Sequence, residues 1–217
     1  MSPIKISSAS RQKTCSVTRA GIGIPQSIIN RTGWQQGRDR VEVGFIAETV
    51  CILLSKPSQS LDSFLVSYAN SRKSTGGRIA CQAFIRYYLQ TLIVLPQRNV
   101  TPIFIEHALW RIAFLLGDVQ WSMAEFSQAG LGKVKRGTPG VYQLLGKNNV
   151  VLRIGEGKIT ERISTHLKDS VRFGQVVLSF GYIELSTKED CEVMEKILLA
   201  RYEAEQGGVP PLNEIRA

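Results

Sequence analysis

The sequence predicts an α+β protein built from three consecutive segments. Residues 1–57 contain short stretches in which apolar and polar residues alternate, which is the period of a half-buried strand. Residues 58–136 carry apolar residues at helical spacing. Residues 137–217 predict a hairpin followed by a helix, a strand and a long helix. The chain has 217 residues, of which 43% are hydrophobic and 21% charged, so a packed core is expected.

The positive charge is confined to the first two segments. The chain carries a formal net charge of +9, and the three segments contribute +5, +5 and −1 in chain order. This distribution predicts that the first two segments meet a polyanion such as nucleic acid. Solubility alone would also account for such a composition, so that alternative stays open.

Cysteine usage and hydropathy indicate a cytoplasmic protein with no membrane partner. The four cysteines include no C-x-x-C pair, which favours reduced core residues. The most apolar stretch, around 79–95, is interrupted by Gln82, Arg86 and Gln90, so it does not predict a membrane span. The opening residues 1–10 lack the apolar centre of a signal peptide.

The first segment predicts a small β-rich unit. A strand is expected at 14–19, followed by a short helix after Pro25, since proline suits the start of a helix. This helix is expected to end near Gly33. Residues 41–45 alternate with period two, and 50–54 supplies a second short strand.

This order of elements resembles the swapped-hairpin DNA-binding domain of the SpoVT/AbrB type over about residues 11–56. The resemblance rests on GIGIP at 21–25, the Gly33-Trp34 step and VEV at 41–43. Family members usually carry arginine directly after the opening glycine, where this chain has Gly21 or Ile22. The resemblance implies a homodimer formed through this N-terminal domain. Phosphate contacts are expected from the basic residues Arg11, Lys13, Arg19 and Arg31.

The second segment, 58–136, predicts a helical connector. Helices are expected on either side of Gly76-Gly77, from Thr101 to Gly117, and briefly around Phe126. The segment ends in a basic linker that is expected to contact DNA through Lys133, Lys135 and Arg136.

The third segment, 137–217, predicts a small antiparallel sheet flanked by helices. Strands are expected at 140–145, 150–155 and 176–185, and a helix at about 158–168. The S-x-x-E pattern at Ser186–Glu189 is typical of a capping box that starts a last long helix.

Three polar side chains of this segment occupy positions that suggest chemistry. Arg162 and His166 are four residues apart and therefore share one face of the predicted helix. Glu195 lies at the margin of the apolar stripe of the last helix. A carboxylate in such a place requires a counter-ion or a metal.

The third segment resembles the GIY-YIG nuclease superfamily over about 80 residues. The resemblance rests on GVY at 140–142, RIG at 153–155, R-x-x-x-H at 162–166, the helical Glu195 and PPLN at 210–213. It implies metal-dependent cleavage of phosphodiester bonds. Glu195 matches the family's metal-binding carboxylate, which holds Mg²⁺ or another divalent ion such as Mn²⁺.

The same resemblance implies roles for six further residues. Tyr142 matches the hydroxyl that activates or orients the attacking water, and Arg162 matches the arginine that holds the scissile phosphate. His166 is expected to relay a proton or to hold the Tyr142 hydroxyl. The remaining three are Asn213, which braces the site, Gly155, which allows close approach to the phosphate, and Arg153, which stands where the family has tyrosine.

Two functions of different class follow from these observations. The first is a metal-dependent endonuclease that acts on double-stranded DNA and is targeted by its N-terminal domain. The second is a dimeric DNA-binding transcriptional regulator whose nuclease-like domain is inactive, because Arg153 replaces a tyrosine hydroxyl. An RNA-processing protein is a third possibility, although the sequence has no aromatic motif of the kind that RNA-recognition domains use.

Overall fold

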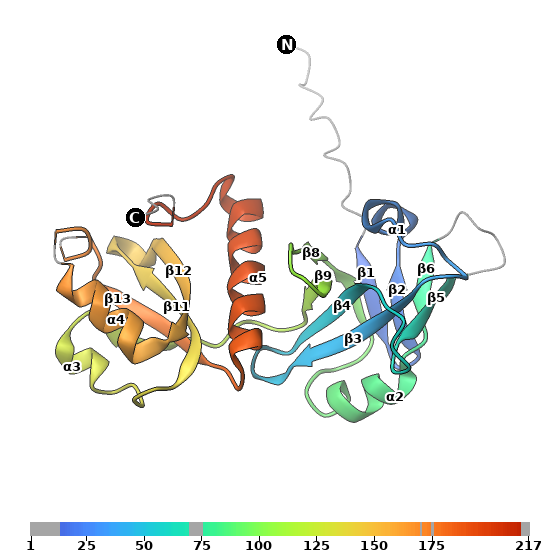
Figure 1. Cartoon of the computed structure of the whole chain (residues 1–217), viewed down its shortest axis with the longest axis horizontal. Coiled ribbons are helices and arrows are strands. Elements are labelled where there is room, and N and C mark those ends of the chain that lie inside the picture. Colours follow the sequence, from blue (N-terminus) through green and yellow to red (C-terminus); the bar gives the residue numbers. More distant parts are fainter. Residues whose placement is uncertain (1–13, 70–75, 170, 175, 214–217) are drawn as a thin grey trace, which may run out of the picture. The chain divides into compact units, whose positions relative to one another are not determined.

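The computed structural model describes residues 14–69, 76–169, 171–174 and 176–213 (Figure 1). Its two antiparallel sheets and several helices confirm the α+β class. Contacts divide the chain into two compact units. Unit 1 comprises the described parts of Met1–Phe45, Ile52–Pro102 and Phe114–Leu116; unit 2 comprises those of Ile46–Cys51, Ile103–Ala113 and Gly117–Ala217. Arg11 and Lys13 lie outside the described residues.

The larger sheet has nine strands in the order β7-β1-β2-β6-β5-β3-β4-β9-β8. Their bounds are β1 (Cys15–Thr18), β2 (Gly21–Ile24), β3 (Arg40–Ile46), β4 (Cys51–Pro57), β5 (Phe64–Tyr68), β6 (Gly77–Ile79), β7 (Gln97–Val100), β8 (Ile103–Phe104) and β9 (Trp110–Leu115). Burial alternates along β1 and β6, and the fully buried residues of the sheet include Val17, Ile22, Val66 and Ile79, whereas Cys51–Ser55 of β4 are buried without interruption. Burial of one apolar face therefore sets the register of the sheet.

The elements predicted for the first segment are present in unit 1. Helix α1 (Gln26–Thr32) follows Pro25, and its buried residues are Ile28 and Ile29. It ends at Gly33, which adopts a left-handed conformation with φ 73° that glycine accepts without strain. A 3-10 turn, η1 (Ala47–Thr49), separates β3 from β4.

The prediction of a helical connector over 58–136 is wrong. This stretch supplies strands β5 to β10, and its helical turns are short: α2 (Gln82–Phe84), the π-helical η2 (Ile85–Leu89) and α3 (Gln128–Leu131). Gly77 pairs with Ile24 on one side and with Tyr68 on the other, so the glycines expected to separate two helices lie at a strand. Pairing with β2 and β5 satisfies this backbone, and that tertiary context outweighs helical spacing.

The smaller sheet has four strands in the order β10-β13-β11-β12. They are β10 (Ser122–Glu125), β11 (Pro139–Leu145), β12 (Val151–Lys158) and β13 (Ser179–Glu184). Between β11 and β12, the turn η3 (Lys147–Asn149) places Asn148 and Asn149 at φ 58°, which asparagine tolerates better than most residues. The hairpin and third strand were predicted, whereas β10 comes from the expected connector.

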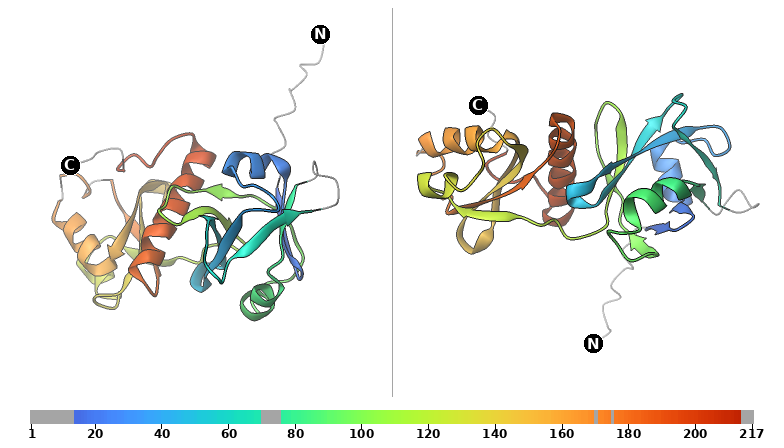
Figure 2. Two further views of the ribbon diagram at one scale, coloured as in Figure 1. Left: turned by 45° about the vertical axis from the view of Figure 1, so that its right-hand side comes forward. Right: turned by 90° about the horizontal axis from the view of Figure 1, so that it is seen from below.

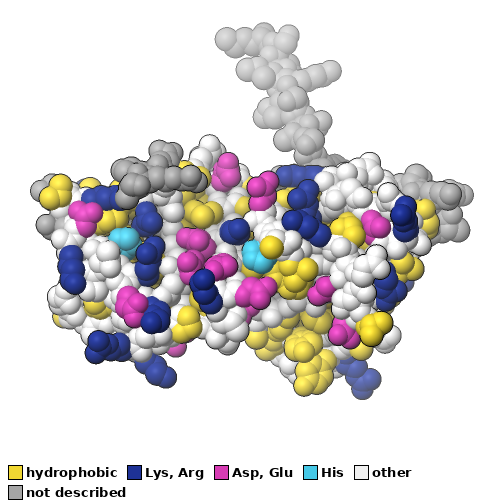
Figure 3. All heavy atoms as spheres, viewed as in Figure 1, with side chains coloured by type: hydrophobic (Ala, Val, Ile, Leu, Met, Phe, Trp, Pro, Cys, Tyr) yellow, Lys and Arg dark blue, Asp and Glu magenta, His cyan; other side chains and the backbone are white. Residues whose placement is uncertain are grey.

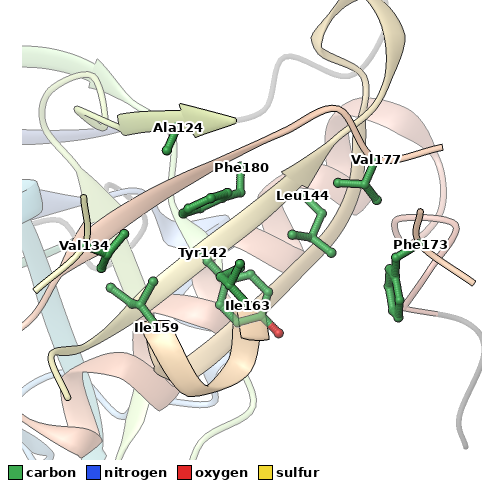
Figure 4. Packing of buried hydrophobic residues seen from close by; sticks show 9 residues of the cluster. All are labelled: Ala124, Val134, Tyr142, Leu144, Ile159, Ile163, Phe173, Val177 and Phe180. Carbon is green, nitrogen blue, oxygen red and sulfur yellow. The ribbon is translucent and has the colours of Figure 1, made fainter. Parts of the chain in front are cut away.

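Two helices pack on the smaller sheet. Helices α4 (Ile159–Lys168) and α5 (Lys188–Gln206) both contact β11 and β12, and the sheet lies between them (Figure 2). On the α4 side, Tyr142, Ile159, Ile163 and Phe180 belong to one buried cluster, in which the Tyr142 ring lies beside Ile163 (Figure 4). The position of Tyr142 on β11 is thus fixed by a packed core.

Helix α5 begins one residue later than the predicted capping box implies. Its N-cap is Thr187, in extended conformation, and the Thr187 hydroxyl accepts a hydrogen bond from the Asp190 amide. The helix ends at Gly207, which is left-handed with φ 79°. No helix among the described residues is both long and apolar enough to cross a membrane.

Gly140 offers a test of this packing. A Cβ atom at this position would lie 2.1 Å from the Ile183 carbonyl oxygen and 2.8 Å from Ile159 Cδ1. We expect Gly140→Ala to lower the free energy of unfolding by on the order of 1–3 kcal/mol in urea denaturation, because backbone must move. At the matched control position, Gly117, a Cβ meets nothing within 4 Å, so Gly117→Ala should change stability by less than about 0.5 kcal/mol. Equal effects would contradict this account.

Candidate active site

A buried hydrogen bond joins two of the predicted site residues. Tyr142 comes from the central strand β11 and His166 from α4, and the Tyr142 hydroxyl oxygen lies 2.8 Å from His166 Nε2. Tyr142 is fully buried and the exposed fraction of His166 is 8%. The imidazole also packs against the Phe173 ring, with centroids 4.5 Å apart. Each polar atom of the pair therefore satisfies the other in an apolar setting.

Gly155 makes room for the Tyr142 side chain. The two residues are register partners on β12 and β11, and a Cβ on Gly155 would lie 2.4 Å from the Tyr142 hydroxyl oxygen. The sequence predicted that Gly155 lets a phosphate approach the backbone. In the structure the Tyr142 ring occupies the space beside Gly155, so the absence of a side chain at Gly155 accommodates the tyrosine.

The environment of His166 keeps its imidazole neutral. Burial, helped by the positive charges of Arg153, Arg162 and Arg172 and opposed by Asp169, lowers the pKa of His166 from 6.5 to about 4. A neutral imidazole has one ring nitrogen that accepts a hydrogen bond. At neutral pH His166 can therefore accept the Tyr142 phenol hydrogen through Nε2.

Arg162 presents a cation beside this pair. Its stem passes over Gly157, where a Cβ would lie 3.2 Å from Arg162 Cγ. Arg162 is exposed and forms no ion pair among the described residues. The positive charge of Arg162 acts on both His166 and Glu195. The guanidinium is thus available to an anion.

Arg153 is engaged with the chain's last described turn. Its Nη1 donates a hydrogen bond of 2.5 Å to the Leu212 carbonyl oxygen, and Arg172 Nη2 donates to the same oxygen at 3.2 Å. The buried Nε of Arg153 has no hydrogen-bond partner within the described ranges, so one donor remains unused. Nothing in the sequence indicated Arg172 as a part of this cluster.

Glu195 is half-buried on α5, as its position on the apolar stripe predicted. Burial raises the pKa of Glu195, and the negative charge of Glu156 raises it further, while Arg153, Arg162 and Lys196 oppose the shift. A raised pKa means that Glu195 lacks full charge compensation from the protein. A cation at this carboxylate would supply that compensation.

Sequence reasoning overlooked Glu156. It is half-buried on β12, between Gly155 and Gly157, and acts on Glu195 and on the Cys191 thiol of α5. Its signal in the sequence was an acidic residue between two glycines, directly after the RIG at 153–155. Across the described parts of the chain, no three His, Cys, Asp or Glu side chains form a group that could hold a metal ion. The oxygen ligands of Glu195, with Glu156 near, fit a hydrated Mg²⁺, which needs only one or two carboxylates.

Asn213 holds the edge strand β12 through its side chain. Asn213 Oδ1 accepts from the Ile154 amide at 2.8 Å, and Nδ2 donates to the Ile154 carbonyl oxygen at 2.7 Å. The Leu212 amide donates to the Leu152 carbonyl oxygen at 2.8 Å. The PPLN turn is therefore fixed beside the strand that carries Arg153, Gly155 and Glu156.

The basic residues expected to meet DNA lie at the surface. Arg19 follows β1 and Arg31 lies in the last turn of α1, both exposed. Lys133, Lys135 and Arg136 are also exposed, but they do not form a free linker, because Val134 between them packs into the core of unit 2. In Figure 3, Lys and Arg side chains lie at several points over α3 and α4, and acidic side chains gather over α5.

Comparison with known proteins gives no relative for this chain: no protein-family model, curated protein or solved structure matches it.

The buried histidine predicts a pH dependence of stability. Because the folded pKa of His166 lies below its unfolded value, the unfolded state binds more protons between about pH 6.5 and 4. The stabilisation is therefore present above pH 6.5 and is lost as the pH falls toward 4. Between pH 7 and pH 5 we expect wild type to lose about 1–2 kcal/mol more unfolding free energy than His166→Asn. Glu195 is common to both proteins, so its titration cancels. Parallel pH profiles in urea denaturation would contradict the burial of a neutral His166.

Proposed function

We propose that unit 2 carries the active centre of a metal-dependent endonuclease that hydrolyses phosphodiester bonds in double-stranded DNA. The observation that carries the proposal is the hydrogen bond between Tyr142 and His166, formed beside the charges of Arg153 and Arg162, which also act on Glu195. These residues come from four separate stretches of chain. A structural core alone would not require a bonded phenol and imidazole beside two guanidiniums whose charges also act on a half-buried carboxylate.

The proposed reaction is the attack of water on a backbone phosphorus atom. The water oxygen forms the new bond to phosphorus, the bond from phosphorus to the leaving sugar oxygen breaks, and a proton passes from the water to the leaving side. With its hydrogen donated to His166, the Tyr142 oxygen keeps lone pairs that can accept a hydrogen from the water and orient it. The neutral His166 holds this arrangement at neutral pH.

The positive side chains act on the phosphate. Arg162 has no ion pair among the described residues and can bind the non-bridging oxygens, where charge grows in the transition state. Arg153, whose charge acts on His166 and Glu195 as that of Arg162 does, adds to the attraction for phosphate. Glu195, with Glu156 near it, would hold Mg²⁺ or Mn²⁺. That ion, when bound, would neutralise phosphate charge and stabilise the leaving oxygen.

Unit 1 is proposed to bind DNA and to form a homodimer, in line with its resemblance to swapped-hairpin domains. Its described residues include Arg19 and Arg31 at the surface. Attachment of a binding unit raises the local concentration of DNA at unit 2, so that the cutting site needs little affinity of its own. All four cysteines are buried free thiols, which supports a reducing, cytoplasmic location.

A second candidate function is favoured by the contact of Arg153. Where the resembling family has a tyrosine hydroxyl, Arg153 instead donates to the Leu212 carbonyl oxygen. A residue committed to that structural bond is less able to assist the attacking water. The alternative is therefore a dimeric transcriptional regulator in which unit 2 binds DNA without cutting it.

Cleavage of supercoiled plasmid with Mg²⁺ separates these functions. We expect wild type to nick or linearise the plasmid and Glu195→Gln to lose at least about a hundredfold in rate, since even indirect partners of a metal site change activity about 10–100-fold. Glu203→Gln, an exposed change on the same helix, should cleave like wild type. Thermal unfolding of Glu195→Gln should stay unchanged.

The other outcomes of this assay are equally informative. Salt-sensitive plasmid binding without cleavage by all three proteins would sink the endonuclease and support the regulator. An RNA substrate tested in parallel identifies a ribonuclease if it alone is cut. Unfolding of Glu195→Gln would show that the carboxylate is structural.

A further inference from the structure

Unit 1 contains an open pocket of about 740 Å³ that is lined by residues along β1 and by residues of β7 and the stretch before it. Its polar lining comes from two stretches far apart in the sequence and consists of Thr14, Ser16, Thr18, Arg19, Arg98 and Asn99. The remaining lining is the apolar surface of Cys15, Leu95 and Pro96. A concave site with an apolar base and a few converging polar groups is the usual form of a ligand site.

An irregularity in strand pairing builds this pocket. Cys15 pairs with Val100 and Val17 pairs with Gln97, so the register shifts by one residue between these pairs. The additional residue on β7 lies among Arg98 and Asn99, and Asn99 adopts φ 60°. Such bulges redirect side chains from the plane of a sheet.

A second interaction fixes the amide of Asn99. The Thr14 hydroxyl donates to Asn99 Oδ1 at 3.2 Å. With its oxygen engaged as an acceptor, the Asn99 side chain has its NH₂ group left as a donor. The pocket therefore carries an amide donor in addition to its hydroxyl groups.

The pocket has positive charge without compensation from its own walls. Neither Arg19 nor Arg98 forms a hydrogen bond or ion pair through its side chain among the described residues, and both are exposed. Among the residues that the structure describes, no acidic side chain lines the pocket. Burial raises the pKa of the Cys15 thiol to about 12, so it stays neutral and offers no counter-charge. Two guanidiniums that share one pocket repel each other, and a bound anion relieves that repulsion.

The chain around Arg98 adds to this charge asymmetry. From Ser63 to Ile105 the sequence contains no aspartate or glutamate, whereas it contains five arginines and lysines. An acidic partner is therefore favoured over a basic one at this part of unit 1.

We propose that this pocket binds a phosphate group through Arg19 and Arg98, with the Asn99 amide and the threonine and serine hydroxyls as further donors. Guanidinium groups bind phosphate oxygens in bidentate fashion, and hydroxyl and amide donors complete such sites. The phosphate has two possible sources, a nucleic-acid backbone or a free nucleotide. For the first source the inference deepens the proposed DNA binding by unit 1, and it does not depend on whether unit 2 cuts.

Binding by full-length protein in the Glu195→Gln background, without divalent metal, tests the pocket separately from cleavage. The variants are Arg19→Gln with Arg98→Gln, and Arg86→Gln as an exposed arginine outside the pocket. Probes are a fluorescent 20-base-pair duplex, adenosine 5′-monophosphate and inorganic phosphate, with affinity measured over a salt series. Because all three arginines are exposed, circular dichroism should show the same fold in each variant.

For a backbone phosphate, the double variant should bind the duplex more weakly and reduce the slope of log affinity against log salt by about 2, whereas Arg86→Gln reduces it by no more than about 1. For a free nucleotide, adenosine 5′-monophosphate should bind to wild type and not to the double variant, while duplex affinity stays unchanged. Inorganic phosphate should compete in either case. If the double variant matches Arg86→Gln with all three probes, the phosphate pocket is refuted, whatever the plasmid assay shows.

Discussion

The hydrogen bond between Tyr142 and His166 is the constraint on which the candidate site depends. A phenol and an imidazole are both buried, so each must find its partner inside the core of unit 2. Burial of this pair also constrains the register between β11 and β12, because Gly155 must lie opposite Tyr142 for the ring to fit. It also reaches into α4, which must present His166 on the same side as Ile159 and Ile163. Packing and chemistry are therefore specified by the same contacts.

Electrostatics links this pair to the carboxylate on α5. The charges of Arg153 and Arg162 disfavour protonation of His166, and the same charges favour ionisation of Glu195. The two arginine charges thus favour a neutral imidazole at His166 and an ionised carboxylate at Glu195. Hydrolysis of a phosphodiester would use this combination of a neutral base and a negative metal ligand. Burial and Glu156 oppose the ionisation of Glu195, and this residual imbalance is what makes a metal cation a suitable partner.

Sequence patterns predicted the elements of the third segment, from residue 137 onward, far better than those of the middle of the chain. The hairpin, α4 and α5 have local signals: a turn at 146–149, helical spacing, and a helix end at Gly207. The stretch 58–136 instead forms strands, several of which pair with β1, β2, β3 or β13 outside the stretch, so local patterns did not identify them. The resemblance of short motifs in the third segment to a nuclease superfamily indicated the candidate residues Tyr142, Arg162, His166, Glu195 and Asn213. Glu156 and Arg172 could be identified only from the structure, because their partners lie far away in the sequence. Glu156 acts on Glu195, and Arg172 donates to the Leu212 carbonyl oxygen.

The turn at Leu212 and Asn213 has a consequence beyond the site. Strand β12 is the last strand of its sheet, so one side of its backbone has no neighbouring strand. The Asn213 amide satisfies both backbone groups of Ile154, and the Leu212 amide satisfies the Leu152 carbonyl group. This short turn thereby imitates an adjoining strand and hides an edge that would otherwise invite pairing with another chain. The same few residues that brace the candidate site thus also cover a strand edge at which another chain could pair.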